Sequence, residues 1–362
     1  YCKLRVQTMS HSSVAVLPGD GIGPEVTAEA IRVLKSVDEQ LNLKLEFSEG
    51  LIGGAALDAT GEPLPSSTVS LCKEADAILL GAVGGSKWEH LPAGPEAGLL
   101  GLRKALGLYA NLRPVKTLPE LVDASPLKAD RLDGVDIMVI RELTGGIYFG
   151  KRKLSSTHAY DTCEYTTEEI KRICRMAGNL AMTRRRKVTS VDKHNVLDTS
   201  RLWRKTATKL FQDEFPEIEL EHIYVDAAAM HLLNRPKDFD VLVTENMFGD
   251  ILSDEASMLA GSLGLLPSAS LSDEGPCLYE PIHGSAPDIA GRDLANPTGA
   301  ILSGAMLLRH SLALPDAAAA VEAAVAAAYA AGLRTPDLRA AENDKNVGTK
   351  TFGEAVLTHL KL

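Results

Sequence analysis

Short apolar runs alternate with longer amphipathic stretches along most of the chain. The run SVAVLPG at 13–19 predicts a short buried strand, and the stretch after it predicts a helix at 24–41 with Pro24 in the first turn. A second amphipathic pattern predicts a helix at 166–186. Apolar runs predict further strands at 76–85, 136–143, 187–193, 218–226 and 239–246. Strands that alternate with helices in this way indicate an α/β fold.

The length of 362 residues allows two domains or one elaborated α/β domain. No internal repeat and no linker divides the chain, so composition alone does not locate a domain boundary. The alanine-rich stretch at 317–331 is low in complexity and predicts a helix that Gly332 closes at its C-terminal cap.

Charge and cysteine content argue against several classes of protein. The net charge of −10 disfavours nucleic acid or an anionic membrane as the main partner. No run of apolar residues is long enough to predict a transmembrane helix. The five cysteines are an odd number without a CxxC pair, which suits neither a disulfide framework nor a zinc site. Reduced thiols are typical of a cytosolic or matrix enzyme, and we expect a cytoplasmic protein.

The first residues, YCKLRVQTMS, are basic but have no apolar segment, so they do not form a secretory signal. We expect residues 1–8 to be a remnant of cloning or of a leader, with translation starting at Met9.

The segment PGDGIGPE at 18–25 follows a predicted strand and precedes a predicted helix. A dinucleotide fingerprint of the Rossmann type needs G-x-G-x-x-G, and Pro24 stands where the third glycine should be. The segment therefore indicates a tight strand-to-helix turn. If the chain binds a nicotinamide nucleotide, we expect it to use a different fold.

Three arginines lie beside apolar or glycine-rich sequence, at Arg103, Arg113 and Arg141. One such arginine is usually a solvated surface residue, but three together suggest a site for carboxylates, which the planar guanidinium binds bidentately. Tyr148 follows Arg141 after two glycines, and a turn there would bring both side chains toward one pocket. Lys193 lies at a predicted strand end, where it is either a salt-bridged surface lysine or a general base.

The segment FGDILSDEAS places Asp250 and Asp254 four residues apart on one face of a predicted helix. These like charges repel, and the segment holds no lysine or arginine that would neutralise them. Asp226 ends another predicted strand. Three carboxylates without thiols or paired histidines suit a hard cation, and Mg²⁺ or Mn²⁺ fits better than zinc.

The segment at 280–303 is rich in Gly, Pro, Ser and Asn and is too long for a simple turn, which is typical of a binding loop. Asp288 could accept hydrogen bonds from both ribose hydroxyls of an adenosine. A 2′-phosphate there would meet a like charge, so NAD⁺ rather than NADP⁺ is expected if this loop holds the nucleotide.

The motifs PGDGIGPE, GLRKALGLYANLRPVK, RELTGGIYFG, VDKHNVL, FGDILSDEASMLAGSLGLLPSASL and YEPIHGSAPDIAG together resemble one family. The chain resembles the β-decarboxylating dehydrogenases from about residue 14 to its C-terminus, and within them the isopropylmalate branch. The resemblance implies an α/β fold of the isocitrate/isopropylmalate dehydrogenase type, not a Rossmann fold. It implies a first domain at 1–108 plus 262–362, on the side of the nucleotide loop. A second domain at 109–261 would be inserted there and carry the metal aspartates and the homodimer interface.

The resemblance also implies roles for the candidate residues. Arg103, Arg113 and Arg141 would bind the substrate carboxylates, and Asp226, which also touches the substrate, would hold Mg²⁺ or Mn²⁺ with Asp250 and Asp254. Lys193 would assist removal of the hydroxyl proton, and Tyr148 would protonate the enol carbon after CO₂ leaves. Lys193 and Asp226 would reach the site of the partner subunit. The implied NAD⁺ contacts are Val83, Glu96, Glu280, His283, Gly284, Ser285, Ala286, Pro287, Asp288, Ile289 and Asn296.

Leu99 and Leu100, one helical turn before Arg103, match the isopropylmalate branch. Isocitrate or homoisocitrate would bury a third carboxylate against these leucines at a cost of several kcal/mol. The expected reaction is oxidative decarboxylation of (2R,3S)-3-isopropylmalate to 4-methyl-2-oxopentanoate in leucine biosynthesis. Alternatives are a related enzyme acting on tartrate, D-malate or another 2-alkylmalate, and a non-catalytic regulatory subunit. His194 departs from the small residue usual in the family, and we expect it to point away from Lys193.

Overall fold

The computed structural model describes residues 12–338, 341 and 344–362. The expectations about residues 1–8 and Met9 lie outside this part of the chain. The described residues form two compact units. The first unit takes the chain up to Leu108, the short segment Leu118–Ser125, and Ala260–Leu362. The second takes Tyr109–Thr117 and Pro126–Leu259. This division differs from the predicted one in assigning 118–125 and 260–261 to the first unit.

The first unit contains five sheet strands in the order β2-β1-β3-β12-β11. The strands are β1 (Ser12–Gly19), β2 (Leu45–Glu49), β3 (Ala77–Ala82), β11 (Pro267–Leu271) and β12 (Cys277–Pro281). All are parallel to their neighbours except β11, which is antiparallel to β12. The six residues of β3, AILLGA, are all buried, because a central parallel strand is covered on both faces.

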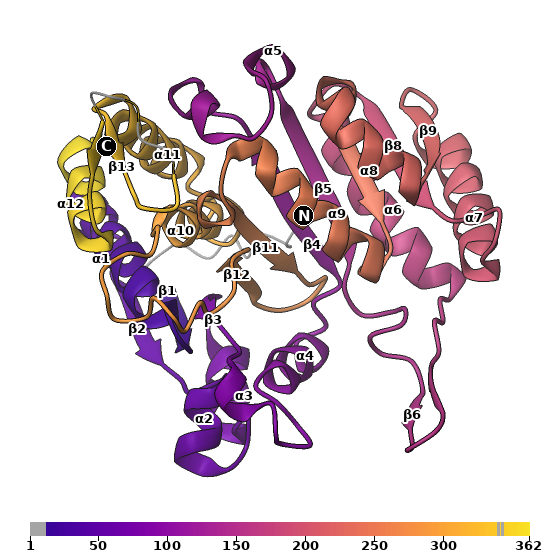
Figure 1. The fold of residues 1–362 in the computed structure, drawn as a ribbon, viewed down its shortest axis with the longest axis horizontal. Helices are drawn as coiled ribbons and strands as arrows, with labels where there is room; N and C mark the ends of the chain where they lie inside the picture. The colour runs from indigo at the N-terminus through magenta and orange to yellow at the C-terminus, as the bar shows by residue number, and fades with distance from the viewer. Residues whose placement is uncertain (1–11, 339–340, 342–343) are drawn as a thin grey trace. The chain divides into compact units, whose positions relative to one another are not determined.

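The helices of the first unit are α1 (Gly23–Leu41), α2 (Gly53–Thr60), α3 (Ser66–Glu74), α4 (Glu96–Ala105), α10 (Thr298–His310), α11 (Pro315–Ala330) and α12 (Thr349–His359). Short elements are the 3₁₀ helices η1 (Ser86–Trp88), η2 (Pro119–Ala124) and η4 (Leu263–Leu265), and a small pair of strands, β13 (Leu333–Arg334) and β14 (Lys345–Asn346). The indigo α1 and the yellow α12 lie side by side, so the two ends of the chain build one unit (Figure 1).

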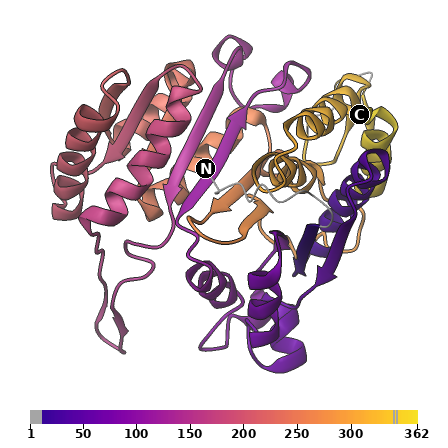
Figure 2. The ribbon, with the colours of Figure 1, turned by 180° about the vertical axis from the view of Figure 1, so that it is seen from behind.

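The second unit has strands in the order β4-β5-β10-β8-β9. They are β4 (Ala110–Lys116), β5 (Asp136–Glu142), β8 (Lys187–Asp192), β9 (Glu219–Tyr224) and β10 (Val241–Thr244), and only β4 runs antiparallel to its neighbour. The helices are α5 (Ala129–Leu132), α6 (Thr167–Met182), α7 (Asp198–Glu214), α8 (Val225–Asn234) and α9 (Asn246–Ala260), with the 3₁₀ helix η3 (Pro236–Asp238). Figures 1 and 2 show α8 and α9 over one face of these strands and α6 and α7 over the other.

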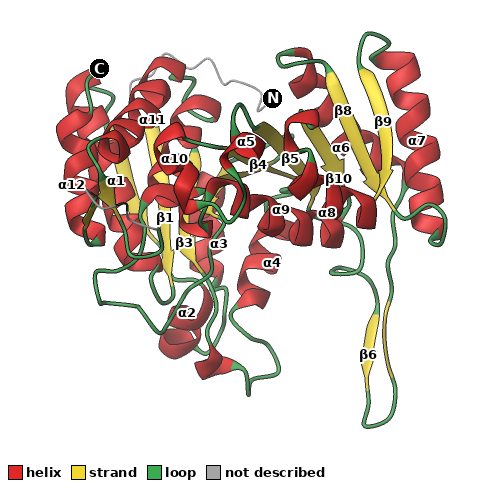
Figure 3. Ribbon diagram, turned by 45° about the horizontal axis from the view of Figure 1, so that its top comes forward, coloured by secondary structure: helices red, strands yellow, loops and turns green. Residues whose placement is uncertain are grey.

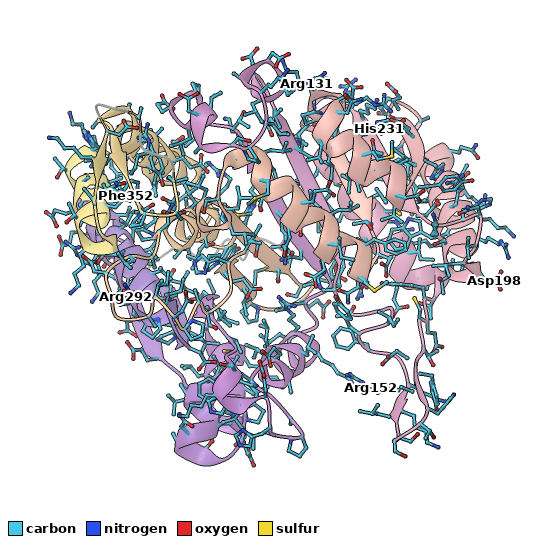
Figure 4. All side chains as sticks on the ribbon, in the orientation of Figure 1. Arg131, Arg152, Asp198, His231, Arg292 and Phe352 are labelled. Atoms are coloured by element: carbon cyan, nitrogen blue, oxygen red, sulfur yellow. The ribbon has the colours of Figure 1, made fainter. Side chains whose placement is uncertain are left out.

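A hairpin of β6 (Arg152–Leu154) and β7 (Ala159–Asp161) extends away from the rest of the second unit (Figure 3). All six residues of its two strands are exposed, and Arg152 marks its position in Figure 4. Leu154, with 86% of its surface exposed, is the most exposed large apolar side chain of the described residues.

The predicted strands and helices are present, with boundaries shifted by a few residues. The hydrophobic core of the first unit gathers Leu17, Ile52, Ile78, Leu80 and Leu102, all at most 1% exposed. At the end of α11, Ala331 takes the cap position and Gly332 follows it with φ +79°, one residue later than predicted. No helix in the described part of the chain is long and apolar enough to cross a membrane.

Candidate active site

One face of α9 carries the two aspartates that the sequence singled out. Asp250 and Asp254 stand one turn apart on this helix, with side chains 37% and 59% exposed. Burial raises the pKa of Asp254, the nearby Arg113 guanidinium lowers it, and the neighbouring Asp250 carboxylate raises it again. The predicted repulsion is therefore present, but cations from other parts of the chain offset it.

Arg113 supplies one of these cations from β4. One terminal nitrogen of its guanidinium lies 3.3 Å from the Asp254 carboxylate and donates to the hydroxyl of Ser253 at 2.5 Å. The other lies 3.8 Å from Asp250. The residue is 7% exposed, and Nε donates to the side-chain oxygen of Asn111 at 2.7 Å, which fixes the plane of the guanidinium. Arg113 stands in a strand directly before Pro114, which disfavours a helical conformation at this position.

Arg141 and Tyr148 both reach Asp250. Arg141, in β5 and 3% exposed, donates to one carboxylate oxygen, and the Tyr148 hydroxyl donates to the other at 2.8 Å. The Arg141 guanidinium also lies 5.7 Å from the centre of the Tyr148 ring. Burial, followed by the hydrogen bond to the Asp250 carboxylate, raises the Tyr148 pKa to about 12. The phenol is therefore protonated at neutral pH, as a proton donor must be.

A buried amide, which the sequence analysis missed, holds this arrangement together. Asn246 begins α9, is 1% exposed, and accepts a hydrogen bond from Arg141 Nε at 3.0 Å. Its side-chain nitrogen donates to the carbonyls of Leu143 and Gly145, in the segment that leads to Tyr148. The signal that could have found it is an asparagine placed between a strand and a helix, where side-chain amides commonly satisfy free backbone groups.

Lys193 and Asp226 form a separate group in the same unit. Lys193 follows β8, Asp226 lies in the first turn of α8, and the ammonium is 2.5 Å from the carboxylate. The hydrogen bond from Lys193 lowers the Asp226 pKa. The Asp226 side chain is 64% exposed and that of Lys193 is 28% exposed. The His194 backbone N–H donates to Asp192 at 2.9 Å.

The metal prediction can be tested against the donors within one chain. No group of three His, Cys, Asp or Glu side chains that could hold a metal ion occurs among residues 12–338, 341 and 344–362. Asp254 supplies an exposed carboxylate of the kind that Mg²⁺ and Mn²⁺ prefer. Asp250 is half-buried, and a metal there would share its oxygens with Arg141 and Tyr148. Asp226 does not join these two aspartates in this chain. The residues present therefore fit a divalent-metal site to which one chain contributes two carboxylate ligands, Asp250 and Asp254.

The first unit carries the other predicted substrate residues on and near α4. Arg103 is 7% exposed and donates to the Glu280 carboxylate on β12 at 2.8 Å. Its Nε is buried without a hydrogen-bond partner among the described residues. Leu99 and Leu100 are half-buried on the same helix, and Leu99 also packs against the hydrophobic core of this unit.

Two segments predicted to contact NAD⁺ approach each other at Gly84, which follows the buried end of β3. A Cβ on Gly84 would lie 2.8 Å from a carboxylate oxygen of Glu96 and 3.8 Å from the Ser285 hydroxyl. This is a place where only a glycine leaves room, beside the half-buried Val83. The predicted contacts Val83 and Glu96 therefore share one region of the first unit with the loop that follows β12.

The loop between β12 and α10 contains the remaining predicted nucleotide contacts, and Arg292 marks it in Figure 4. His283 Nε2 is buried without a hydrogen-bond partner among the described residues, and burial lowers the pKa of this imidazole, which favours the neutral ring. Gly284, Pro287 and Asp288 are exposed, whereas Ala286 and Ile289 are half-buried. Asn296 is 4% exposed. Its side-chain nitrogen donates to the Tyr329 hydroxyl and the Asp337 carboxylate, and its side-chain oxygen accepts from the Thr298 N–H, so a nucleotide would have to contact its backbone. The loop fits a nucleotide.

Comparison with known proteins identifies the family. A model described as "Isocitrate/isopropylmalate dehydrogenase" matches residues 13–356. The chain belongs to the isocitrate/isopropylmalate dehydrogenase family. It is 56% identical over 356 residues to the 3-isopropylmalate dehydrogenase of Rhodopirellula baltica, covering 97% of this chain and 99% of that one. It is 57% identical over 350 residues to the enzyme of the same name from Priestia megaterium, covering 95% and 94%.

Solved structures agree with this family. The isocitrate dehydrogenase of Methylococcus capsulatus is 34% identical with a TM-score of 0.87, covering 97% of this chain and all of that one. A β-decarboxylating dehydrogenase from Thermococcus kodakarensis is 36% identical with a TM-score of 0.78, covering 96% of each chain. The predicted family, its fold type and the prediction of an oxidoreductase are therefore confirmed.

Proposed function

We propose that this chain catalyses the NAD⁺-dependent oxidative decarboxylation of (2R,3S)-3-isopropylmalate to 4-methyl-2-oxopentanoate, a step of leucine biosynthesis. The single observation that carries the proposal is the cluster on α9, where Arg141 and Tyr148 meet at Asp250 and Arg113 meets Asp254. Relatives that match nearly the whole chain at 56–57% identity carry the name of this activity. A cytoplasmic location is part of the proposal.

The substrate is a dicarboxylate with one apolar branch. Arg113 and Arg141 are nearly buried guanidinium groups already oriented by the amides of Asn111 and Asn246, so little entropy is lost when they bind a carboxylate. Arg103 adds a third, with its unpartnered Nε. Leu99 and Leu100 would receive the isopropyl group, because a half-buried leucine pair stabilises an alkyl chain and rejects a charge.

The reaction requires three tasks of the protein. Lys193 takes part in removing the hydroxyl proton from C2, and Tyr148 delivers a proton to C3 after the carboxylate bonded there has left as CO₂. Asp250 holds the tyrosine hydroxyl in place at 2.8 Å. NAD⁺, when bound, would be the hydride acceptor, and Mg²⁺ or Mn²⁺, which Asp250 and Asp254 would hold, would supply electrophilic assistance to the substrate.

We extend the proposal to a homodimer with shared active sites. Within one chain, Lys193 and Asp226 pair with each other and not with the residues of the α9 cluster, and Asp226 is largely exposed. The second unit also exposes large apolar side chains, with Met230 on α8 at 66% and Ile251 on α9 at 59%. Such an apolar surface supports pairing with a second copy, which would bring its Lys193 and Asp226 to the α9 cluster.

Two alternatives remain weaker. A related enzyme acting on tartrate, D-malate or another 2-alkylmalate would use the same arginines and differ only around Leu99 and Leu100, where one methylene changes specificity by about 1–3 kcal/mol. A regulatory subunit without catalysis would not need the protonated Tyr148 or Lys193, and both are present.

A turnover assay tests the proposal. The purified protein is incubated with Mg²⁺ or Mn²⁺, NAD⁺ and each of 3-isopropylmalate, isocitrate, D-malate and tartrate, and NADH is followed at its absorbance maximum. We expect the highest kcat/KM with 3-isopropylmalate and NAD⁺. A higher kcat/KM with any of the other acids would refute the substrate, and an absence of turnover with every acid would favour the regulatory subunit.

A further inference from the structure

The turn between β1 and α1, in the segment PGDGIGPE, has no role in the proposed chemistry but contains a buried carboxylate. Asp20 is 4% exposed. Among the described residues, no lysine or arginine forms an ion pair with its carboxylate. Its own backbone N–H donates to the Ala82 carbonyl at 2.7 Å. Burying a carboxylate without a cation costs free energy unless several hydrogen-bond donors surround it. The donors around Asp20 therefore identify the segments that it holds in place.

Three backbone N–H groups from two distant segments surround Asp20. The Gly54 and Ala55 N–H groups donate at 2.8 and 2.7 Å, and both belong to the first turn of α2, where the helix dipole also favours an anion. The Gly84 N–H donates at 2.9 Å. Gly53, with φ +73°, leaves room for this contact, because a Cβ there would lie 2.5 Å from a carboxylate oxygen. One carboxylate therefore joins α2 to the residue after β3.

The same turn also holds the loop after β12. The Ile22 N–H donates to the Ser285 carbonyl at 2.8 Å. A Cβ on Gly21 would lie 1.9 Å from that carbonyl oxygen, so the two backbones approach as closely as a glycine allows. The turn thus contacts both Gly84 and Ser285, the two points at which the predicted nucleotide segments converge.

We propose that Asp20 is a positioning residue for the nicotinamide nucleotide: through the Gly84 N–H it sets the segment from Val83 to Glu96 against the loop around Ser285. This inference rests on the proposed NAD⁺ use. The segment PGDGIGPE does not bind the dinucleotide as a glycine fingerprint would. Instead, its aspartate fixes the backbone of the two segments that do.

The carboxylate is suited to this task because it only accepts hydrogen bonds. Gly54 and Gly84 donate to one carboxylate oxygen and Ala55 donates to the other. An asparagine of the same shape would turn its N–H₂ group either toward Ala55 or toward both Gly54 and Gly84, so at least one end of the link between α2 and Gly84 would lose its hydrogen bond. The Gly84 segment would then be free to shift relative to Ser285. The dicarboxylate site should change little, because the Asp20 side chain bonds to Gly54, Ala55 and Gly84 and not to the arginines.

The test compares Asp20→Asn and Asp20→Ser with Asp240→Asn. Asp240 is the control because it is also buried, at 1% exposed, and also accepts from a backbone N–H, that of Arg185 at 2.9 Å, but lies in the second unit; unlike Asp20 it also pairs with the Arg184 guanidinium at 2.8 Å. Steady-state kinetics with 3-isopropylmalate and NAD⁺, and equilibrium binding of NADH by fluorescence, are measured for each variant. For both Asp20 variants we expect KM for NAD⁺ and Kd for NADH to rise about tenfold or more. The KM for 3-isopropylmalate should change by less than about twofold, and Asp240→Asn should leave all three constants near wild type.

Equal increases in both KM values, or unchanged NADH binding in the Asp20 variants, would overturn the proposal. If neither Asp20 variant folds while Asp240→Asn does, Asp20 is required for folding rather than for positioning, and the proposal also fails. Hydrogen exchange separates this inference from the proposed activity. Faster exchange at 83–96 in Asp20→Asn, but not in Asp240→Asn, supports the positioning even if the wild-type enzyme prefers another acid. Unchanged exchange there refutes it even if 3-isopropylmalate is the substrate.

Discussion

Replacing Tyr148 with phenylalanine removes one oxygen from the α9 cluster and changes little else. The hydroxyl donates to Asp250 at 2.8 Å, while the ring lies 5.7 Å from the Arg141 guanidinium. Phenylalanine keeps the ring, and Asp250 keeps its bond with Arg141. The lost hydrogen bond should lower the free energy of unfolding by about 1–2 kcal/mol, because its acceptor is a carboxylate that water partly solvates. General acid catalysis contributes a factor of about 10²–10⁴, so we expect kcat to fall by that factor, which is about 3–5 kcal/mol in the activation free energy.

Steady-state NADH formation with 3-isopropylmalate gives kcat and KM, and thermal unfolding gives the change in stability. Tyr279→Phe is the control, because it removes a tyrosine hydroxyl that bonds to Ser311 at 2.8 Å within the first unit. We expect that control to lose stability but to keep kcat. A Tyr148→Phe enzyme with near-normal kcat would refute the role of the phenol as proton donor.

Two further predictions concern the shared site and the dependence of stability on pH. Lys193→Ala and Asp250→Asn homodimers should each be inactive, but unfolding and refolding them together should restore up to about a quarter of wild-type activity, because half the dimers would be mixed and hold one intact site. No recovery, despite mixed dimers detected by native mass spectrometry, would contradict shared sites. Burial lowers the His222 pKa from 6.5 to about 4. Between these two pH values His222 is protonated in the unfolded state but neutral in the folded state, so the free energy of unfolding should fall as the pH drops from about 6.5 to 4. The expected loss of unfolding free energy over this range approaches about 3 kcal/mol. Urea titrations at several pH values should show a much smaller loss for His222→Gln. An equally large loss in that variant would mean that other groups cause it.

The residue pattern predicted the α/β fold because buried parallel strands are continuous apolar runs, as AILLGA in β3 is. It also brought Asp250 and Asp254 to one helix face, since helical spacing alone determines this. The cations beside them were not predictable in the same way. Arg113 and Arg141 come from strands more than a hundred residues earlier, and only the packing of β4 and β5 near α9 makes them partners of the aspartates.

Two buried side chains show why the rest of the candidate site escaped the sequence analysis. Asn246 resembles an ordinary helix-start residue, and its three bonds to Arg141, Leu143 and Gly145 depend on a segment that is distant in sequence. Asp20 was interpreted only as part of a tight turn, because its partners Gly54 and Gly84 are 34 and 64 residues away. A one-dimensional pattern reports spacing within an element, whereas these roles arise from backbone groups of other elements.

The insertion of the second unit between the two parts of the first has a consequence for synthesis on the ribosome. Strand β3 pairs with β1 on one side and with β12 on the other, and β12 begins at Cys277. At about 5–20 residues per second, roughly 10–40 seconds pass between translation of β3 and arrival of β12. During that interval the edge of the apolar β3 that pairs with β12 stays open. The nascent chain therefore exposes an unpaired apolar strand for longer than a contiguous domain would, and this interval is when it is most prone to aggregate.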